Sequence, residues 1–190
     1  MGMRNGELRW FLPESRGILP VAEFHVPDRF EQYLKKQPFE VRWNTAFREV
    51  MHGCADRDET WITEDIISSY QQLHDLGHAH SAEVWRDGRL VGGVYGVAVG
   101  AAFFGESMFS RETQASKVAL VALQRRLQER GFVLHDTQWT TPHLAMFGGH
   151  EIPCDDYLTL LYRAVRLRAK FMDAKTGKVR VDRDFREHKS

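Results

Sequence analysis

The sequence predicts an α+β domain in which helices flank a mostly antiparallel sheet. Three observations lead to this fold class. Helical patterns dominate the first part of the chain, three strand-like runs follow one another between residues 82 and 104, and a long helical pattern separates them from one later strand. Consecutive strands joined by short turns pair antiparallel, and we expect the helices before and after them to cover the sheet.

Short elements fill the first 60 residues. We expect an extended segment at residues 17–20, a helix at about 28–36, a strand at 39–43 and a helix at 46–52. Gly53 is expected to end this last helix, because glycine adopts the left-handed conformation that follows many helices.

The next helix has clearer boundaries. Thr63 is a good N-cap, the acidic residues after it favour the positive end of the helix dipole, and Gly77 can end the helix. Apolar residues recur at helical spacing within it, so it has a predicted core face made of Ile66, Ile67, Tyr70 and Leu73.

The three strands form a predicted meander. Residues 82–85 and 90–99 are separated by Asp87-Gly88, a dipeptide typical of two-residue hairpin turns. Gly100 then precedes a third apolar run at 101–104. The spacing therefore predicts three consecutive antiparallel strands.

The second half begins with a long helix, predicted at 113–130, followed by a strand at 132–139. Thr141-Pro142 is typical of a helix start and predicts a short helix to about residue 147. A last helix is expected at 156–168. The long helix carries an apolar stripe of Leu120, Leu123 and Leu127.

Length and composition indicate one soluble domain. The chain has 190 residues, of which 43% are hydrophobic and 27% charged. We expect a single domain over 1–168 and a charged, flexible or loosely docked tail over 169–190. No apolar run is long enough for a membrane span and no signal peptide is recognisable, so a cytoplasmic, monomeric protein is expected.

The charges are unevenly distributed. The formal net charge is zero, yet residues 163–190 contain ten Lys or Arg against four Asp or Glu. This segment is either a basic patch that contacts phosphates or a solvated tail. Cys54 and Cys154 are far apart and form no CxxC motif, so neither a disulfide framework nor a thiolate zinc site is indicated.

Three polar residues are candidates for chemistry. Asp136 and Gln138 lie two residues apart on a predicted strand, so we expect their side chains on one face with Leu134. They form either a partly enclosed polar pair or an ordinary exposed face. Glu106 stands among apolar residues and is a charge at the start of the following helix, a buried partner for an arginine, or a catalytic group.

Two other kinds of site are not indicated. His74, His78 and His80 lack the spacing of a zinc-binding HExxH helix, because Gly77 interrupts the pattern. The serines near Glu106 are not in a GxSxG nucleophile motif. We therefore expect neither a metal nor a serine nucleophile.

Several long motifs occur in order and closely resemble those of the bacterial leucyl/phenylalanyl-tRNA protein transferases. The similar region extends from about Trp10 to Val165. The resemblance implies an N-acetyltransferase-like fold, a fold that the order of elements also suits by analogy. The motifs are GCADRDETWIT (53–63), LHDLGHAHSAEVW (73–85), LVGGVYGVAVG (90–100), GESMFSRETQASKVAL (105–120) and HEIPCDDYL (150–158).

The resemblance implies an aminoacyltransferase. Such an enzyme moves leucine or phenylalanine from the 3′ end of aminoacyl-tRNA to proteins that begin with Arg or Lys, marking them for degradation by the N-degron route (N-end rule). It uses no metal or organic cofactor. The family's catalytic residues fall on Asp136, Gln138 and Glu106, and the aromatic that stacks on the terminal adenosine falls on Trp61. The remaining substrate-binding positions fall on Tyr70, Val94, Met108, Ser110, Leu120, Leu123 and Leu127.

The reaction requires a neutral amine aligned on an ester carbon. A glutamine amide is too weak a base to remove a proton, so we expect Gln138 to accept a hydrogen bond from the amine. Asp136 is then expected to fix that amide or to supply negative charge for a cationic acceptor. The alternatives are a non-catalytic binder of tRNA or protein N-termini, and an acetyl-CoA-dependent N-acetyltransferase. SRETQASK (110–117) lacks the glycines of an acetyl-CoA-binding turn.

The chain departs from the family pattern in two respects. The family usually begins with a further N-terminal domain that has its own adenosine-stacking tryptophan; we expect this chain to lack that domain, with Trp10 or Trp43 as the substitute. Leu123 and Leu127 stand where the family tends to have aromatics, and His135 stands where it has an apolar residue. The preference among Leu, Phe and Met therefore stays open.

Overall fold

A computed structural model describes residues 13–36 and 39–172 of the chain. Within them the sheet order is β2-β3-β4-β5-β6-β1-β7, and among its pairs only β5 and β6 are parallel. The strands are β1 (Ser15–Ile18), β2 (Glu40–Trp43), β3 (Ala79–Arg86), β4 (Arg89–Val99), β5 (Ala102–Ser110), β6 (Leu134–Gln138) and β7 (His150–Pro153). The helices are α1 (Asp28–Lys36), α2 (Phe47–Ala55), α3 (Glu64–Asp75), α4 (Ala115–Glu129), α5 (Pro142–Ala145) and α6 (Cys154–Ala164).

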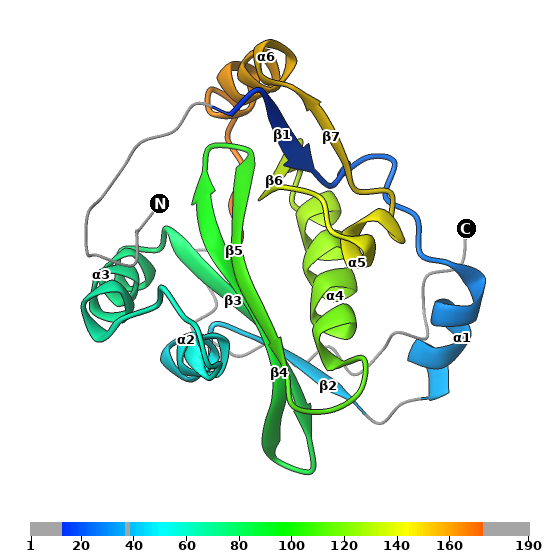
Figure 1. Cartoon of the computed structure of the whole chain (residues 1–190), viewed down its shortest axis with the longest axis vertical. Coiled ribbons are helices and arrows are strands. Elements are labelled where there is room, and N and C mark those ends of the chain that lie inside the picture. Colours follow the sequence, from blue (N-terminus) through cyan, green and yellow to red (C-terminus); the bar gives the residue numbers. More distant parts are fainter. Residues whose placement is uncertain (1–12, 37–38, 173–190) are drawn as a thin grey trace.

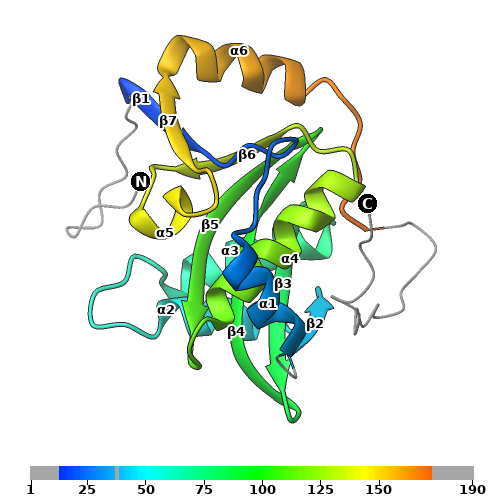
Figure 2. The same cartoon turned by 90° about the vertical axis from the view of Figure 1, so that its right-hand side faces the viewer.

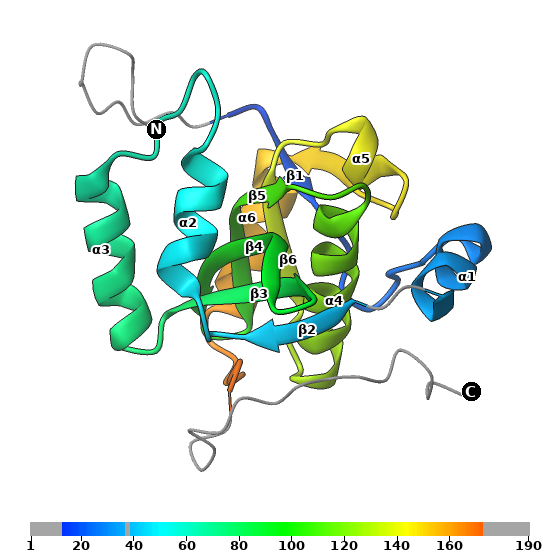
Figure 3. The same ribbon diagram turned by 90° about the horizontal axis from the view of Figure 1, so that it is seen from below.

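Helices cover both faces of the sheet (Figure 1). Seen from below, α2 and α3 lie on one face and α4 on the other (Figure 3). Helix α6 runs across one end of the molecule, beside β1 and β7 (Figure 2). The predicted α+β class, a mostly antiparallel sheet flanked by helices, is confirmed.

Three apolar clusters hold these layers together. The largest lies between the sheet and α4, the second joins α2 and α3 to the opposite face, and the third lies under α6. Neighbouring residues of one strand belong to different clusters, as Val94 and Tyr95 of β4 do. The side chains of β4 therefore alternate between the two faces, as those of a strand buried on both sides must.

Local signals predicted several elements correctly. Helix α1 has the expected bounds, and α3 begins after Thr63, whose side chain accepts a hydrogen bond from the N–H of Ile66. Asp87 and Gly88 both have positive φ, 51° and 73°, as a type I′ hairpin turn requires. These elements depend on interactions between residues that are close in the chain, so they can be predicted from the sequence.

Other boundaries differ from the prediction. Helix α2 continues through Gly53 to Ala55, and the glycine serves packing instead: a Cβ there would lie 2.8 Å from the ring of Phe109. Strand β5 continues past Phe104 to Ser110, because β4 pairs with it along that length. Helix α6 lies at Cys154–Ala164, shifted from the predicted 156–168.

The described beginning of the predicted tail packs on the domain. Phe171 is buried, stacks against Phe103 and His80, and its carbonyl accepts a hydrogen bond from Nε of Arg126. Residues 173–190 of the predicted tail lie outside the described residues. Trp43 is buried in the main core, so it cannot act as an exposed stacking surface, and Trp10 lies outside the described residues. Among the helices that the structure describes, none has the length and apolar character to cross a membrane.

Candidate functional site

A cavity of about 360 Å³ opens where two parallel strands diverge. Strands β5 and β6 pair only from Ala102 to Phe104 and from Leu134 to Asp136. Beyond this point the strands separate, and the residues that follow line the cavity. Its lining consists of Arg57, Trp61, Val94, Gly105, Glu106, Ser107, Met108, Leu120, His135, Thr137, Gln138, Trp139, Thr141, His143 and Leu144.

A β-bulge at Glu106 shapes one wall. Ser107 is opposite Tyr95 and Gly105 is opposite Gly96, so Glu106 is an extra residue with no partner on β4. A bulge shifts the alternation of side chains by one residue. This explains why Phe103 before the bulge and Met108 after it both face the α4 side.

Strand β6 ends in an unusual backbone conformation at the opposite wall. Gln138 has φ of 68°, in the left-handed region that non-glycine residues rarely adopt. The amide N–H of Gln138 donates to Oδ1 of Asp136 at 2.7 Å, which holds the turn in place. The left-handed residue directs the Gln138 side chain into the cavity that His135 and Thr137 also line, whereas Asp136 lies outside the lining. The expectation that Asp136 and Gln138 share one face is thus corrected.

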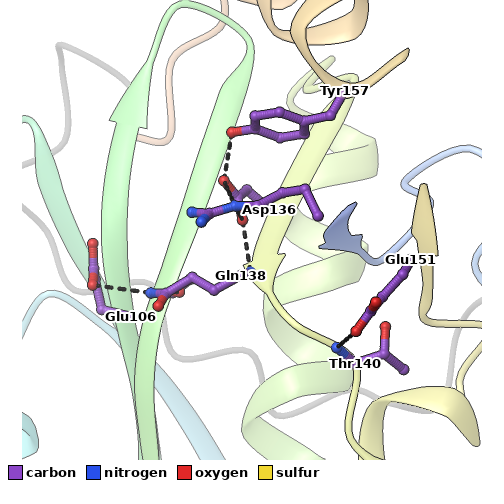
Figure 4. Close-up of polar contacts among 8 residues, drawn as sticks. Glu106, Asp136, Gln138, Thr140, Glu151 and Tyr157 are labelled. Carbon is purple, nitrogen blue, oxygen red and sulfur yellow. Dashed lines mark hydrogen bonds and ion pairs between the residues drawn. The ribbon is translucent and has the colours of Figure 1, made fainter. Parts of the chain in front are cut away.

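Asp136 is fully buried behind the cavity wall and bound by three residues (Figure 4). Nε of Arg16 donates to both carboxylate oxygens, at 3.0 and 3.1 Å, and the hydroxyl of Tyr157 donates to Oδ2 at 2.5 Å. With the Gln138 N–H, these donors satisfy the carboxylate, which therefore connects β1 and α6 to the end of β6. Asp136 fixes the backbone of Gln138 and does not contact its side-chain amide.

The amide of Gln138 bridges the gap between the two strands. Its Nε2 donates to the carbonyl of Gly105 at 3.3 Å. It also donates to Oε2 of Glu106 at 3.4 Å (Figure 4). Because the nitrogen is engaged by β5, the amide oxygen is left to accept a hydrogen bond from a ligand. The structure thus brings Glu106 and Gln138 together from opposite walls of one cavity.

Glu106 is largely buried, and its position on β5 excludes the expectation of a charge at the start of the next helix. Burial raises the pKa of its carboxyl group, a hydrogen bond with Tyr70 lowers this pKa, and the charge of Asp136 raises it again. Burial likewise raises the pKa of Tyr70, so its phenol stays protonated and donates to the carboxylate.

Glu106→Gln should increase stability at neutral pH. A carboxyl group whose pKa is raised in the folded protein stabilises below its unfolded pKa, and this stability is lost as pH rises through the raised value. Glutamine cannot ionise, so the variant keeps this stability at neutral pH. Urea unfolding of both proteins between pH 4 and 8 measures the effect. At pH 7 the variant should have the higher free energy of unfolding, and the difference should shrink toward pH 4. A gain that grows toward acid pH would contradict the raised pKa.

No side chain near the cavity is activated as a nucleophile in the described part of the chain. Burial raises the pKa of the Cys54 thiol to about 12. The hydroxyl of Ser107 accepts a hydrogen bond from Nη2 of Arg57 at 2.8 Å, which withdraws electron density from it. A serine nucleophile instead needs a base to accept its proton. Arg57 is itself held at the cavity rim by donating through Nε to the carbonyl of Cys54.

Two of the three histidines of the sequence motif, His74 and His80, serve packing, whereas His78 is exposed. His74 stacks on Phe47 and contacts the carbonyl of Ala79 through Nδ1, and burial lowers the pKa of His80 to about 3. Within the described residues there is no group of three or more His, Cys, Asp or Glu side chains that could hold a metal ion.

The predicted binding residues fall into two groups. Trp61, Val94, Met108 and Leu120 line the cavity with the catalytic candidates Glu106 and Gln138. The others do not line it: Tyr70 contacts Glu106 from α3, Ser110 bonds to the backbone near the start of α4, and Leu123 and Leu127 are buried in the main core.

The structure adds site residues that the sequence did not indicate. Arg16 and Tyr157 bind Asp136 from elements distant in the chain. Trp139 is 52% exposed and lines the cavity next to Gln138, and His143 reaches the same wall from α5. Trp139 directly follows Gln138 in the sequence, and a tryptophan next to a candidate catalytic residue is the signal that could have identified it.

Gly17→Ala should impair the site from a distance. A Cβ on Gly17 would lie 2.4 Å from the carbonyl carbon of Trp139, and a backbone atom can yield only if β1 or the end of β6 moves. Because this shift displaces Gln138, we expect activity to fall about 10- to 100-fold. Steady-state kinetics and thermal unfolding of the variant measure the effect. Unchanged activity would mean that the close approach of β1 does not position the site.

The site combines hydrogen-bonding groups with an apolar wall and, among the described residues, no activated nucleophile, as suits an enzyme that positions its substrates without forming a covalent bond to them. The comparisons with known proteins are more specific. The chain belongs to the leucyl/phenylalanyl-tRNA protein transferase family, whose model matches residues 18–162.

Three similar proteins are each named leucyl/phenylalanyl-tRNA protein transferase. The one from Herpetosiphon aurantiacus is 51% identical over 168 residues, covering 88% of both chains. The one from Akkermansia muciniphila is 50% identical, covering 84% of this chain and 85% of its own. The one from Paramagnetospirillum magneticum is 54% identical, covering 86% and 80%.

A solved structure, AAC(6′)-Iy in complex with a bisubstrate analogue, matches 76% of this chain and 99% of its own with 12% identity. Its TM-score of 0.40 is too low to support an argument about fold or function.

Proposed function

We propose that this protein transfers leucine or phenylalanine from aminoacyl-tRNA to acceptor proteins that begin with Arg or Lys, and so marks them for degradation. It would do so in the cytoplasm, as a monomer and without a cofactor. The observation that carries the proposal is the amide of Gln138 at the cavity, oriented so that its oxygen faces an incoming group. Family membership supports the same activity.

The lining of the cavity supports a proposed position for each part of the aminoacyl end. Val94, Met108 and Leu120 offer an apolar surface for the transferred side chain. Trp61 is 40% exposed at the cavity, and its indole can stack on the terminal adenine. The aminoacyl ester would then lie near Gln138, between the two walls.

The reaction needs an amine held close to the ester carbon. The Gln138 oxygen would accept a hydrogen bond from the amine and direct its lone pair at the carbon. Glu106, beside the amide, supplies negative charge where the attacking amine becomes cationic. As the new C–N bond forms, the ester C–O bond breaks, the proton of the amine passes to the ribose oxygen, and the tRNA leaves with a free hydroxyl. Asp136 is a positioning residue, because it holds the backbone of Gln138 and stays outside the cavity.

The direct test is transfer of labelled leucine from charged tRNA to a peptide that begins with Arg. The same peptide with an acetylated N-terminus is the matched control, since it lacks the nucleophile. Label on the free peptide and none on the control is the expected result. A folded protein that binds charged tRNA and labels neither peptide would refute transfer and support a binding role.

Acetyl transfer is the other alternative. Gln114 precedes α4 with φ of 70° and no side-chain cap, and the segment SRETQASK (110–117) has no glycine that would let a pyrophosphate approach the backbone. Acetyl-CoA should therefore give no thermal stabilisation. Clear stabilisation would favour the acetyltransferase.

A further inference from the structure

One wall of the largely apolar cavity carries a buried imidazole. His135 of β6 is 1% exposed and lines the cavity together with Val94, Met108 and Leu120. Its ring packs edge to face against Phe103, with centroids 5.5 Å apart. The imidazole is therefore fixed in an apolar setting, where an unpaired polar atom costs free energy.

Hydrogen bonds determine which ring nitrogen carries the proton. Nε2 of Gln124 donates to the carbonyls of Leu19 and Pro20, at 3.3 and 2.9 Å. The oxygen of this amide must then be the group that faces Nδ1 of His135, 2.7 Å away. A carbonyl oxygen only accepts, so Nδ1 carries the hydrogen.

The second nitrogen is consequently an acceptor. Burial lowers the pKa of His135 to about 4, so at neutral pH the ring is neutral and Nε2 has a lone pair. Nε2 has no hydrogen-bond partner among the described residues. It lies beside Gly105 at the cavity lining, where an added Cβ would be 3.0 Å from it, so a larger residue at this position would crowd Nε2.

We propose that Nε2 of His135 is a specificity-determining acceptor, which lets the pocket take, besides leucine and phenylalanine, transferred side chains that end in an O–H or N–H donor. The inference rests on the proposed function. Tyrosyl and phenylalanyl groups are the clearest pair, because they differ only by a hydroxyl. A site that contains a buried acceptor discriminates against the analogue that leaves it unpaired.

The test measures relative transfer of tyrosine and phenylalanine from one tRNA sequence charged with either amino acid. The kcat/KM for tyrosine divided by that for phenylalanine should fall at least about tenfold in His135→Leu. The kcat/KM for phenylalanine itself should be kept or improved. His150→Leu makes the same substitution at an exposed histidine outside the cavity and should leave the ratio unchanged.

A second variant covers the case in which His135→Leu does not fold. Gly105→Ala adds a methyl group against Nε2 and leaves the histidine in place, so it should also lower the ratio. An unchanged ratio of tyrosine to phenylalanine transfer in whichever variant folds would overturn the inference. So would the absence of tyrosine transfer by the unmodified protein. In both cases, transfer of phenylalanine would still uphold the proposed function. No transfer of either amino acid by the folded protein would instead refute the proposed function, and the inference with it.

Discussion

Replacing Gln138 by Ala should reduce the single-turnover rate constant for aminoacyl transfer about 100-fold or more. The amide bridges β5 and β6 and directs its oxygen at the incoming amine, so its loss leaves the amine without an orienting group. Misplacement of a reacting group by about 1 Å can cost two orders of magnitude in rate. The measurement is single-turnover transfer with saturating charged tRNA and peptide, accompanied by an unfolding curve.

Gln138→Gly serves as the matched control for this prediction. The left-handed backbone of Gln138, with φ of 68°, is strained for glutamine or alanine and relaxed for glycine. The glycine variant should therefore be at least as stable as the unmodified protein and as inactive as the alanine variant. Near-normal transfer by either variant would exclude an orienting role for Gln138.

Replacing Asp136 by Ala should destabilise the protein by about 3 kcal/mol as well as impair transfer. The change leaves Arg16 and the Tyr157 hydroxyl without the carboxylate that joins them inside the fold. Arg16 is 28% exposed and can be partly solvated, so the lower end of the usual range for a broken buried ion pair applies. Urea unfolding at pH 7 measures the loss.

Two further variants separate the structural and kinetic effects of Asp136. Tyr157→Phe removes one donor to the carboxylate, and a loss of about 1 kcal/mol is expected with little change in rate. Asp136→Asn keeps the shape and should lower kcat more than it raises KM, because the backbone of Gln138 loses a charged acceptor. An Asp136→Ala variant of full stability would contradict the anchoring network.

Elements whose structure is determined by local interactions were predicted correctly from the sequence. The cap at Thr63 and the left-handed turn at Asp87-Gly88 follow from the chemistry of a few adjacent residues. Strand β7 was missed because it is a short edge strand, mostly exposed, without the apolar alternation that predicts a strand. Its register is set by β1, more than 130 residues earlier in the chain.

The geometry of the site depends on two departures from regular strands that no pattern revealed. The bulge at Glu106 shifts the alternation along β5, and the left-handed Gln138 interrupts the alternation at the end of β6. Asp136 holds the left-handed Gln138, and contacts with Arg16 and Tyr157, which are distant in the chain, fix Asp136 in turn. The resemblance to a family identified Glu106, Asp136 and Gln138, but not that Asp136 lies behind the wall.

The limits of the binding pocket were also beyond the sequence. Leu120, Leu123 and Leu127 share one apolar stripe on α4, yet only Leu120 reaches the cavity. The spacing of the leucines predicts that they share one face of α4, but it does not predict what packs against each of them. One end of the stripe therefore lines the cavity, and the rest lies in the core. His135 occupies the inner wall instead.

Direct attack on the ester by an amine that Gln138 orients is tested most directly by a rapid-quench measurement of one turnover. Labelled leucyl-tRNA is bound in advance, and a peptide that begins with Arg is then added. Label should appear on the peptide N-terminus as fast as it leaves the tRNA, without ever being attached to the protein, and about 100-fold more slowly in Gln138→Ala. Label that passes through a covalent protein intermediate, or an equal rate in the variant, would contradict direct attack by an amine that Gln138 orients.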